Sequence, residues 1–202
     1  ALAETREQER IESRQKGLKR WLRADAYYPS LAAIPWSAYR AQGIKLVLLD
    51  IDNTLSVHGR DESPDAAREQ VERIRAAALE PVLLSNALAD RAQAFAGTLG
   101  LDVIGQANKP STHGIDVARE RYGRSAEEIV LVGDQLFTDI WAGKRAGVWT
   151  VRVDPIDPQE PWWILLKRVG ERLLRKTLGY DKHYDQITTN ASANQENGKS
   201  ET

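Results

Sequence analysis

The chain has 202 residues, of which 42% are hydrophobic and 28% are charged, and its formal net charge at pH 7 is −1. This balance is ordinary for a globular domain and gives no overall signal for binding nucleic acid. Because the chain contains no cysteine, disulfide bonds, thiolate catalysis and cysteine-ligated zinc are excluded. Since we find neither a run of about 18 apolar residues nor a secretory signal, we expect a cytoplasmic protein that is soluble or peripherally bound to a membrane.

The character of the chain changes near residue 16. Residues 1–15 are polar and charged, and we expect them to form a solvated extension. The next segment places Leu18, Trp21 and Leu22 at helical spacing among several basic side chains. Such a short basic amphipathic helix suits either a membrane surface or packing against the domain that follows.

The stretch IKLVLLDIDNTL, residues 44–55, predicts a buried parallel strand that ends at Asp50. Asp52 follows two residues later, so two like charges lie close together at the end of a buried strand. Burial and mutual repulsion make this arrangement costly unless a divalent cation neutralises it. The simpler alternative is a strand-end turn without chemistry, because Asp, Asn and Thr all favour turns.

Strand and helix patterns then alternate through the middle of the chain. We expect helices at residues 64–79, 88–98, 111–121 and 138–145 and strands at residues 81–85, 101–104, 128–132 and 149–153. Strands that alternate with helices of this length form βαβ units. The predicted fold class is therefore α/β, a doubly wound parallel sheet of about five strands whose carboxyl ends share one edge.

Polar side chains gather at this edge, where the predicted strands end. Besides the acids that follow the first strand, they are Ser85, Asn86, Lys109, Asp134 and Asp139. Phosphoryl transfer uses these residue types: one carboxylate attacks phosphorus, a second exchanges the proton, and a hydroxyl and a lysine hold the phosphate oxygens. The remaining acids can bind Mg²⁺, so the pattern predicts a phosphoryl-transfer site.

The segments DIDNT, LLSN, NKP and GDQLFTD occur in this order and resemble the four motifs of the haloacid dehalogenase (HAD) superfamily of phosphotransferases. The similarity extends from about Leu22 to Arg175 and is strongest to the YqeG-type phosphatases. That group is related to the phosphatidylglycerophosphate phosphatases of mitochondria and plastids. The resemblance implies a HAD-like fold and a phosphomonoester hydrolase that works through a phospho-aspartate intermediate.

The same resemblance implies roles for individual residues of the site. Asp50 would be the nucleophile, and Asp52 would be the general acid and base. Ser85 and Lys109 would bind the phosphate, and Asn86 would either join them or serve as a turn residue. Because superfamily members without an acid at the position of Asp52 tend to be dehalogenases or ATP-driven pumps, its presence favours a phosphatase.

The resemblance also implies a Mg²⁺ site at the same edge. Its ligands would be the carboxylates of Asp50 and Asp134 together with the backbone carbonyl of Asp52. Asp139 would be a further ligand or an acid just outside the coordination sphere.

Many members of this superfamily carry cap domains that enclose small substrates. Here residues 56–79 have room for one loop and one helix, and residues 87–108 for one helix and one strand. We therefore expect a capless enzyme with an open site. Such a site suits a lipid, a macromolecule, or a small molecule that a neighbouring subunit encloses. The last case would require a homo-oligomer.

The segment after Pro161 is the second basic amphipathic stretch of the chain. Its apolar stripe includes Trp162, Leu166 and Leu173, and five Lys and Arg residues accompany it. It either lies at an anionic membrane surface or packs on the sheet. We expect one domain over residues 16–180 and a disordered tail over residues 181–202, where the composition is polar.

Three functional hypotheses follow from these patterns. The first is a Mg²⁺-dependent phosphatase that converts phosphatidylglycerophosphate to phosphatidylglycerol, peripherally bound at the inner face of the membrane. The second is a capless phosphatase for a soluble or protein-bound phosphate. The third is a non-enzymatic assembly module with the same fold, against which the intact set of acids counts. Phosphate release from a panel of substrates separates the three.

Overall fold

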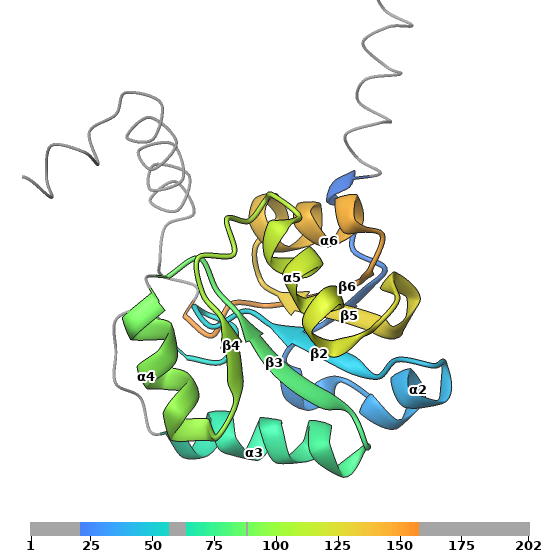
Figure 1. Ribbon diagram of the computed structural model, residues 1–202. Helices are drawn as coiled ribbons and strands as arrows, with labels where there is room; N and C mark the ends of the chain where they lie inside the picture. The colour runs from blue at the N-terminus through green and yellow to red at the C-terminus, as the bar shows by residue number, and fades with distance from the viewer. Residues whose placement is uncertain (1–20, 57–63, 88, 158–202) are drawn as a thin grey trace, which may run out of the picture. The chain divides into compact units, whose positions relative to one another are not determined.

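The computed structural model describes residues 21–56, 64–87 and 89–157. These residues form one six-stranded parallel sheet with strand order β1-β6-β5-β2-β3-β4 (Figure 1). The strands are β1 (Ala26–Tyr28), β2 (Leu46–Leu49), β3 (Glu80–Leu84), β4 (Asp102–Ile104), β5 (Ile129–Gly133) and β6 (Trp149–Val153). The chain runs outward from β2 in both directions, which confirms the doubly wound α/β architecture.

Five α-helices and three short turns connect the strands in the described part of the chain. The helices are α2 (Trp36–Ala41), α3 (Pro64–Ala76), α4 (Ala89–Leu99), α5 (His113–Tyr122) and α6 (Trp141–Ala146). The turns are the 3₁₀ segments η1 (Leu31–Ala33) and η2 (Ala126–Glu128) and a π-helical segment, η3 (Leu136–Ile140). Figure 1 shows α3 and α4 on one face of the sheet and α5 and α6 on the other.

Two hydrophobic cores hold these layers together, and the alternation of side chains along β2 divides that strand between them. Val47 and Leu49 join the core that contains residues of α2, α3 and α4. Leu46 and Leu48 join the core that contains residues of α5 and α6. Because both faces are covered, all four side chains are buried, as expected for a central parallel strand.

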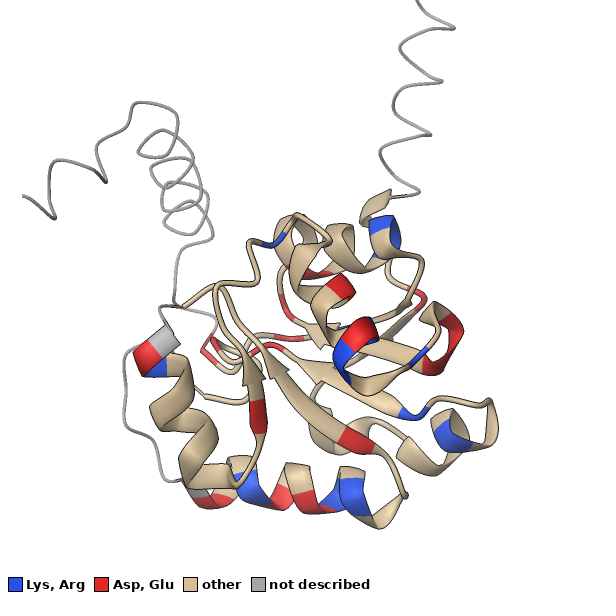
Figure 2. Ribbon diagram, in the orientation of Figure 1, with Lys and Arg blue, Asp and Glu red and all other residues tan. Residues whose placement is uncertain are grey.

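Helix α3 illustrates how the sequence pattern positions a layer. Val71 and Ile74 are fully buried against the sheet, whereas the outer face carries the alternating charges that Figure 2 shows. The helix ends at Ala76, three residues earlier than predicted. The chain turns there because Ala78 adopts a left-handed conformation, with φ of 58°.

The sheet has six strands rather than about five, because Ala26–Tyr28 adds an edge strand parallel to β6. The residue before the strand, Asp25, helps to hold it against β6. Its carboxylate accepts hydrogen bonds from the backbone N–H and the hydroxyl of Thr150, at 2.9 and 2.8 Å. A three-residue edge strand has too little periodicity to be recognised from its own sequence.

The predicted end segments lie largely outside the described residues. These are the extension at residues 1–15, most of the first amphipathic helix, the helix after Pro161 and the tail at residues 181–202. Of the first helix, Trp21 and Leu22 are described and helical, and the indole of Trp21 is exposed. Within the described ranges, no helix is both long enough and apolar enough to cross a bilayer.

Candidate active site

The candidate site lies at the carboxyl ends of β2, β3 and β5, where the order of the strands reverses. Asp50 follows β2 directly, and its backbone N–H donates to the carbonyl of Val132 on β5 at 2.9 Å. The side chains of Asp50 and Asp134, which follows β5, are both buried. Figure 2 shows acidic positions on the loops at this edge, apart from the charged outer faces of the helices. Parallel α/β sheets bind their ligands at this crevice.

Lys109 is the buried cation of this cluster. Its Nζ lies 2.5 Å from Oδ1 of Asp50, 2.6 Å from Oδ1 of Asp139 and 3.0 Å from the carbonyl oxygen of Leu84. Asn86 holds the lysine backbone in place: its Oδ1 accepts from the Lys109 N–H at 2.8 Å, and its Nδ2 donates to the Lys109 carbonyl at 2.9 Å. The ammonium therefore donates two hydrogen bonds and forms an ion pair with Asp139, and an entering phosphate must share or displace one of these partners.

Asp139 is fully buried and belongs to η3 rather than to the regular helix predicted from residue 138. Its Oδ2 accepts from the backbone N–H of Gln135 at 3.1 Å. Gly133 makes room for this carboxylate, because a Cβ at that position would lie 2.4 Å from Oδ2. Gly133, the first residue of the GDQLFTD motif, therefore gives Asp139 its place in the site, a steric role that the sequence alone did not predict.

Carboxylate oxygens of Asp50, Asp134 and Asp139 all lie within 4.8 Å of one another. Burial and the charge of Asp139 raise the pKa of Asp50 well above its usual range, although Lys109 opposes the shift. Burial and the same neighbour raise the pKa of Asp134 to about 7. Burial would lower the pKa of Lys109, but Asp139 and Asp50 outweigh it and raise that pKa above its ordinary value. Three carboxylates against one ammonium leave excess negative charge, and their hard oxygen donors fit Mg²⁺.

Asp52 lies at the rim of the site rather than in the buried cluster. Its side chain is 20% exposed, and its Oδ1 accepts a hydrogen bond at 2.8 Å from Nη2 of Arg91, on the first turn of α4. The loop that carries Asp52 turns sharply at the next residue, Asn53, whose φ is 61° and whose N–H donates to the carbonyl of Ser56 at 2.7 Å. Sequence reasoning missed Arg91, because nothing local links it to a residue on another loop.

A family model described as Mitochondrial PGP phosphatase, where PGP is phosphatidylglycerophosphate, matches residues 19–156. The chain belongs to this family.

Two curated relatives and one solved structure show how far the similarity of this family member extends. Probable phosphatase YqeG of Bacillus subtilis is 26% identical over 166 residues, which cover 82% of this chain and 96% of that protein. Phosphatidylglycerophosphate phosphatase 1 of Chlamydomonas reinhardtii, a chloroplastic protein, is 29% identical over 150 residues, which cover 69% of this chain and 56% of that protein. The NagD structure from E. coli has a TM-score of 0.44 at 19% identity and covers 55% of this chain and 87% of that one. The family and these named relatives identify the chain as a phosphatase.

Two hydroxyl side chains complete the site of this PGP phosphatase family member: Ser85, which was predicted, and Thr54. Ser85 is buried, and its Oγ accepts from the backbone N–H of Ala87 at 3.0 Å. Thr54, on the loop after β2, donates from its hydroxyl toward Oδ1 of Asp134 at 3.4 Å. The structure thus brings Asp50, Lys109, Asp134 and Asp139 together, sets Asp52 at the rim, and uses Asn86 to fix the lysine loop.

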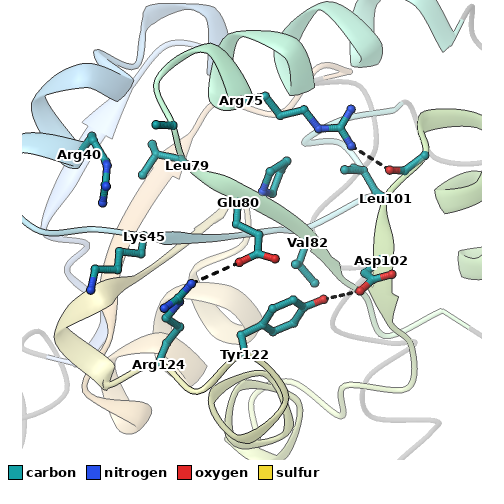
Figure 3. A pocket seen from close by; sticks show the side chains of 13 residues that line it. Arg40, Lys45, Arg75, Leu79, Glu80, Val82, Leu101, Asp102, Tyr122 and Arg124 are labelled. Carbon is teal, nitrogen blue, oxygen red and sulfur yellow. Dashed lines mark hydrogen bonds and ion pairs between the residues drawn. The ribbon is translucent and has the colours of Figure 1, made fainter.

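A separate hollow of about 560 Å³ lies at the opposite, amino-terminal edge of the sheet (Figure 3). Its charged walls are paired: Arg124 lies 3.7 Å from Glu80, and Arg75 donates to the carbonyl of Gly100 at 2.8 Å. The hydroxyl of Tyr122 likewise donates to Asp102 at 2.8 Å. This hollow therefore does not belong to the reaction centre of the phosphatase.

Proposed function

We propose that this phosphatase is Mg²⁺-dependent, acts through a phospho-aspartate on Asp50, and dephosphorylates phosphatidylglycerophosphate at a membrane surface. The observation that carries the chemical part is the buried cluster of Asp50, Asp134 and Asp139 around Lys109. Such a concentration of like charge is costly unless a cation neutralises it, and a cation held there can also bind the oxygens of a phosphate.

The proposed reaction begins with an attack by a carboxylate oxygen of Asp50 on the phosphorus of the monoester. The bond between phosphorus and the ester oxygen breaks, and Asp52 gives its proton to the departing alkoxide. Lys109 holds Asp50 in place and offers positive charge to the phosphate oxygens. The product alcohol leaves, and Asp50 carries the phosphoryl group.

The second half of the proposed reaction restores the enzyme. Asp52, now a carboxylate, takes a proton from a water molecule that attacks the phosphorus. The bond between phosphorus and Asp50 breaks, and inorganic phosphate leaves. When bound, Mg²⁺ would be held by the carboxylates of Asp50, Asp134 and Asp139 with the backbone carbonyl of Asp52, and would neutralise charge on the phosphate oxygens.

Several features support a lipid substrate. The family model carries the PGP name, and two relatives are named phosphatidylglycerophosphate phosphatases. In the described part of the chain, neither the segment between β2 and β3 nor the one between β3 and α5 holds a cap domain. A hollow of about 360 Å³ lies beside the loop after β2, and apolar side chains such as Leu31, Leu55 and Val153 form much of its wall. An open site next to an apolar hollow suits the headgroup of a lipid whose acyl chains remain in the membrane.

The proposed location is the inner face of the cytoplasmic membrane, with peripheral attachment through basic amphipathic segments. Flotation with vesicles tests this part separately from the chemistry. Binding should be stronger to vesicles rich in anionic lipid than to neutral ones and should weaken as salt is added. Equal flotation with both kinds of vesicle would show that the protein is not attached by electrostatic attraction to anionic lipid.

A phosphate-release panel tests the substrate. It compares phosphatidylglycerophosphate with glycerol 3-phosphate and a phosphopeptide at equal Mg²⁺ concentration. The proposed function requires the highest kcat/KM for the lipid. If kcat/KM is higher for the soluble monoester or for the peptide, that class is the substrate rather than the lipid. The proposed phosphatase chemistry would be unaffected.

A further inference from the structure

Arg91 combines two properties that the reaction described above does not use. Its side chain is half-exposed, at 50%, yet its Nη2 lies 2.8 Å from Oδ1 of Asp52, the residue that would act as general acid and base. Lys109, in contrast, is buried and shared among Asp50, Asp139 and a backbone carbonyl. The site therefore has an inner cation that is fully engaged and an outer cation at the rim that solvent reaches.

A partner of Asp52 must be able to leave it. The acid has to approach the oxygen of the departing alcohol, and a tight ion pair at its Oδ1 competes with that contact. Because the Arg91 side chain is half-exposed, its pair with Asp52 contributes little to stability, and the guanidinium can exchange the carboxylate for another anion at low cost. The structure thus places an exchangeable cation beside the general acid, where a second anionic group of the substrate, on the side of the leaving alcohol, would meet it.

We propose that Arg91 forms a subsite for a second, non-reacting phosphate of the substrate. On binding, its guanidinium exchanges the Asp52 carboxylate for a phosphodiester that is joined to the leaving oxygen through one glycerol unit. A planar guanidinium suits this role because it holds two phosphate oxygens at once. The exchange frees Asp52 and selects substrates that carry a diester next to the monoester. This inference rests on the proposed function and narrows its substrate class.

Three substrates separate the second phosphate from the acyl chains. Glycerol 3-phosphate has the monoester alone, glycerophosphoglycerophosphate adds the diester, and a short-chain phosphatidylglycerophosphate adds the acyl groups. For Arg91→Ala, the ratio of kcat/KM for either diester substrate to that for glycerol 3-phosphate should fall by about 10- to 100-fold, chiefly through KM. Arg91→Lys, which keeps the charge but loses the planar group, should recover part of the ratio.

Binding without turnover gives an independent measurement. In an Asp50→Asn background, calorimetry compares the Kd of glycerophosphoglycerophosphate with and without Arg91→Ala. The Kd should rise by about 10- to 100-fold, and the Kd of glycerol 3-phosphate should rise much less. Arg68→Ala is the matched control: Arg68 is also half-exposed, at 53%, but donates to the carbonyl of Thr98 on the outer side of α4. It should leave both ratios unchanged.

Two results would overturn the subsite. If Arg91→Ala lowers kcat/KM by the same factor for all three substrates, Arg91 only positions Asp52. If the Kd values of both ligands stay the same, Arg91 does not touch the substrate. Failure of the proposed function looks different, because the wild-type protein would then release no phosphate from the two diester compounds, whatever stands at residue 91.

Discussion

Gly133 and Asp139 are placed so that a side chain on the first would overlap the second: a Cβ at residue 133 would lie 2.4 Å from Oδ2 of Asp139. The last residue of β5 must therefore be glycine for the π-helical turn to bring its carboxylate into the cluster. This contact links the packing of the sheet to the charge arrangement of the site.

Gly133→Ala should displace Asp139 and lower both stability and activity. The overlap involves a buried side chain held by Lys109, so we expect a loss of about 1–3 kcal/mol in unfolding free energy and a drop in phosphate release. Gly97→Ala is the control, because Gly97 lies in α4 and a Cβ there would have no neighbour within 4 Å. That change should be neutral or slightly stabilising in denaturant titrations. Equal effects of the two changes would refute the steric argument.

Lys109→Gln should be among the most damaging single changes in the protein. It leaves the buried carboxylates of Asp50 and Asp139 without their cation, and breaking such a pair costs about 3–5 kcal/mol. Lys45→Gln is the comparison, since Lys45 pairs with Glu128 at 2.5 Å but its side chain is 44% exposed. Exposed pairs contribute about 0–1 kcal/mol. Thermal unfolding measures both, and a Lys109 variant as stable as the Lys45 variant would contradict the stabilising role of the buried lysine.

The stability of the metal-free protein should fall as pH rises. The pKa of Asp134 is raised from 3.8 to about 7 by burial and by Asp139, so the folded state holds a proton that the unfolded state releases. Its stabilising contribution is complete below about pH 4 and is lost as pH rises toward 7. We expect the melting temperature in chelator to drop by on the order of 5 °C over this window.

Added Mg²⁺ should reverse this loss, because a bound cation favours the carboxylate form. The stabilisation by Mg²⁺ should therefore grow as pH rises toward 7, and Asp134→Asn should flatten the pH dependence in chelator. Melting curves at several pH values, with and without Mg²⁺, make the comparison. If the stabilisation by Mg²⁺ does not depend on pH, Asp134 does not bind the cation.

Much of the fold and most of the buried site could be predicted from the sequence. The run before Asp50 is rich in apolar residues, and acids that directly follow such strands must meet at one edge of a parallel sheet. What could not be predicted depends on contacts between distant segments. The edge strand β1 pairs with β6 beside the contact between Asp25 and Thr150, and Arg91 meets Asp52 across the rim. Neither pair leaves a periodic pattern in the local sequence.

The helix ends and the turn at Asp139 show the same limit on a smaller scale. Gly123 and Gly147 end α5 and α6 with φ of 59° and 72°, close to the predicted helix ends at residues 121 and 145. The π-helical turn of η3 was expected to be the start of a regular helix, because its apolar spacing suits either geometry. The contacts of Asp139 with Gly133 and Lys109 accompany the π-helical geometry, and these contacts are visible only in the folded structure.

Phosphate release from short-chain phosphatidylglycerophosphate tests the proposed chemistry most directly, with wild-type protein and Asp50→Asn each assayed in Mg²⁺ and in excess chelator. We expect release by the wild-type protein with Mg²⁺ only, and none above background by Asp50→Asn. The melting temperature of that variant should match or exceed that of the wild-type protein, because a buried like charge is removed. Release by folded Asp50→Asn at a rate near that of the wild-type protein would contradict the phospho-aspartate mechanism, and full activity in chelator would contradict the role of the metal.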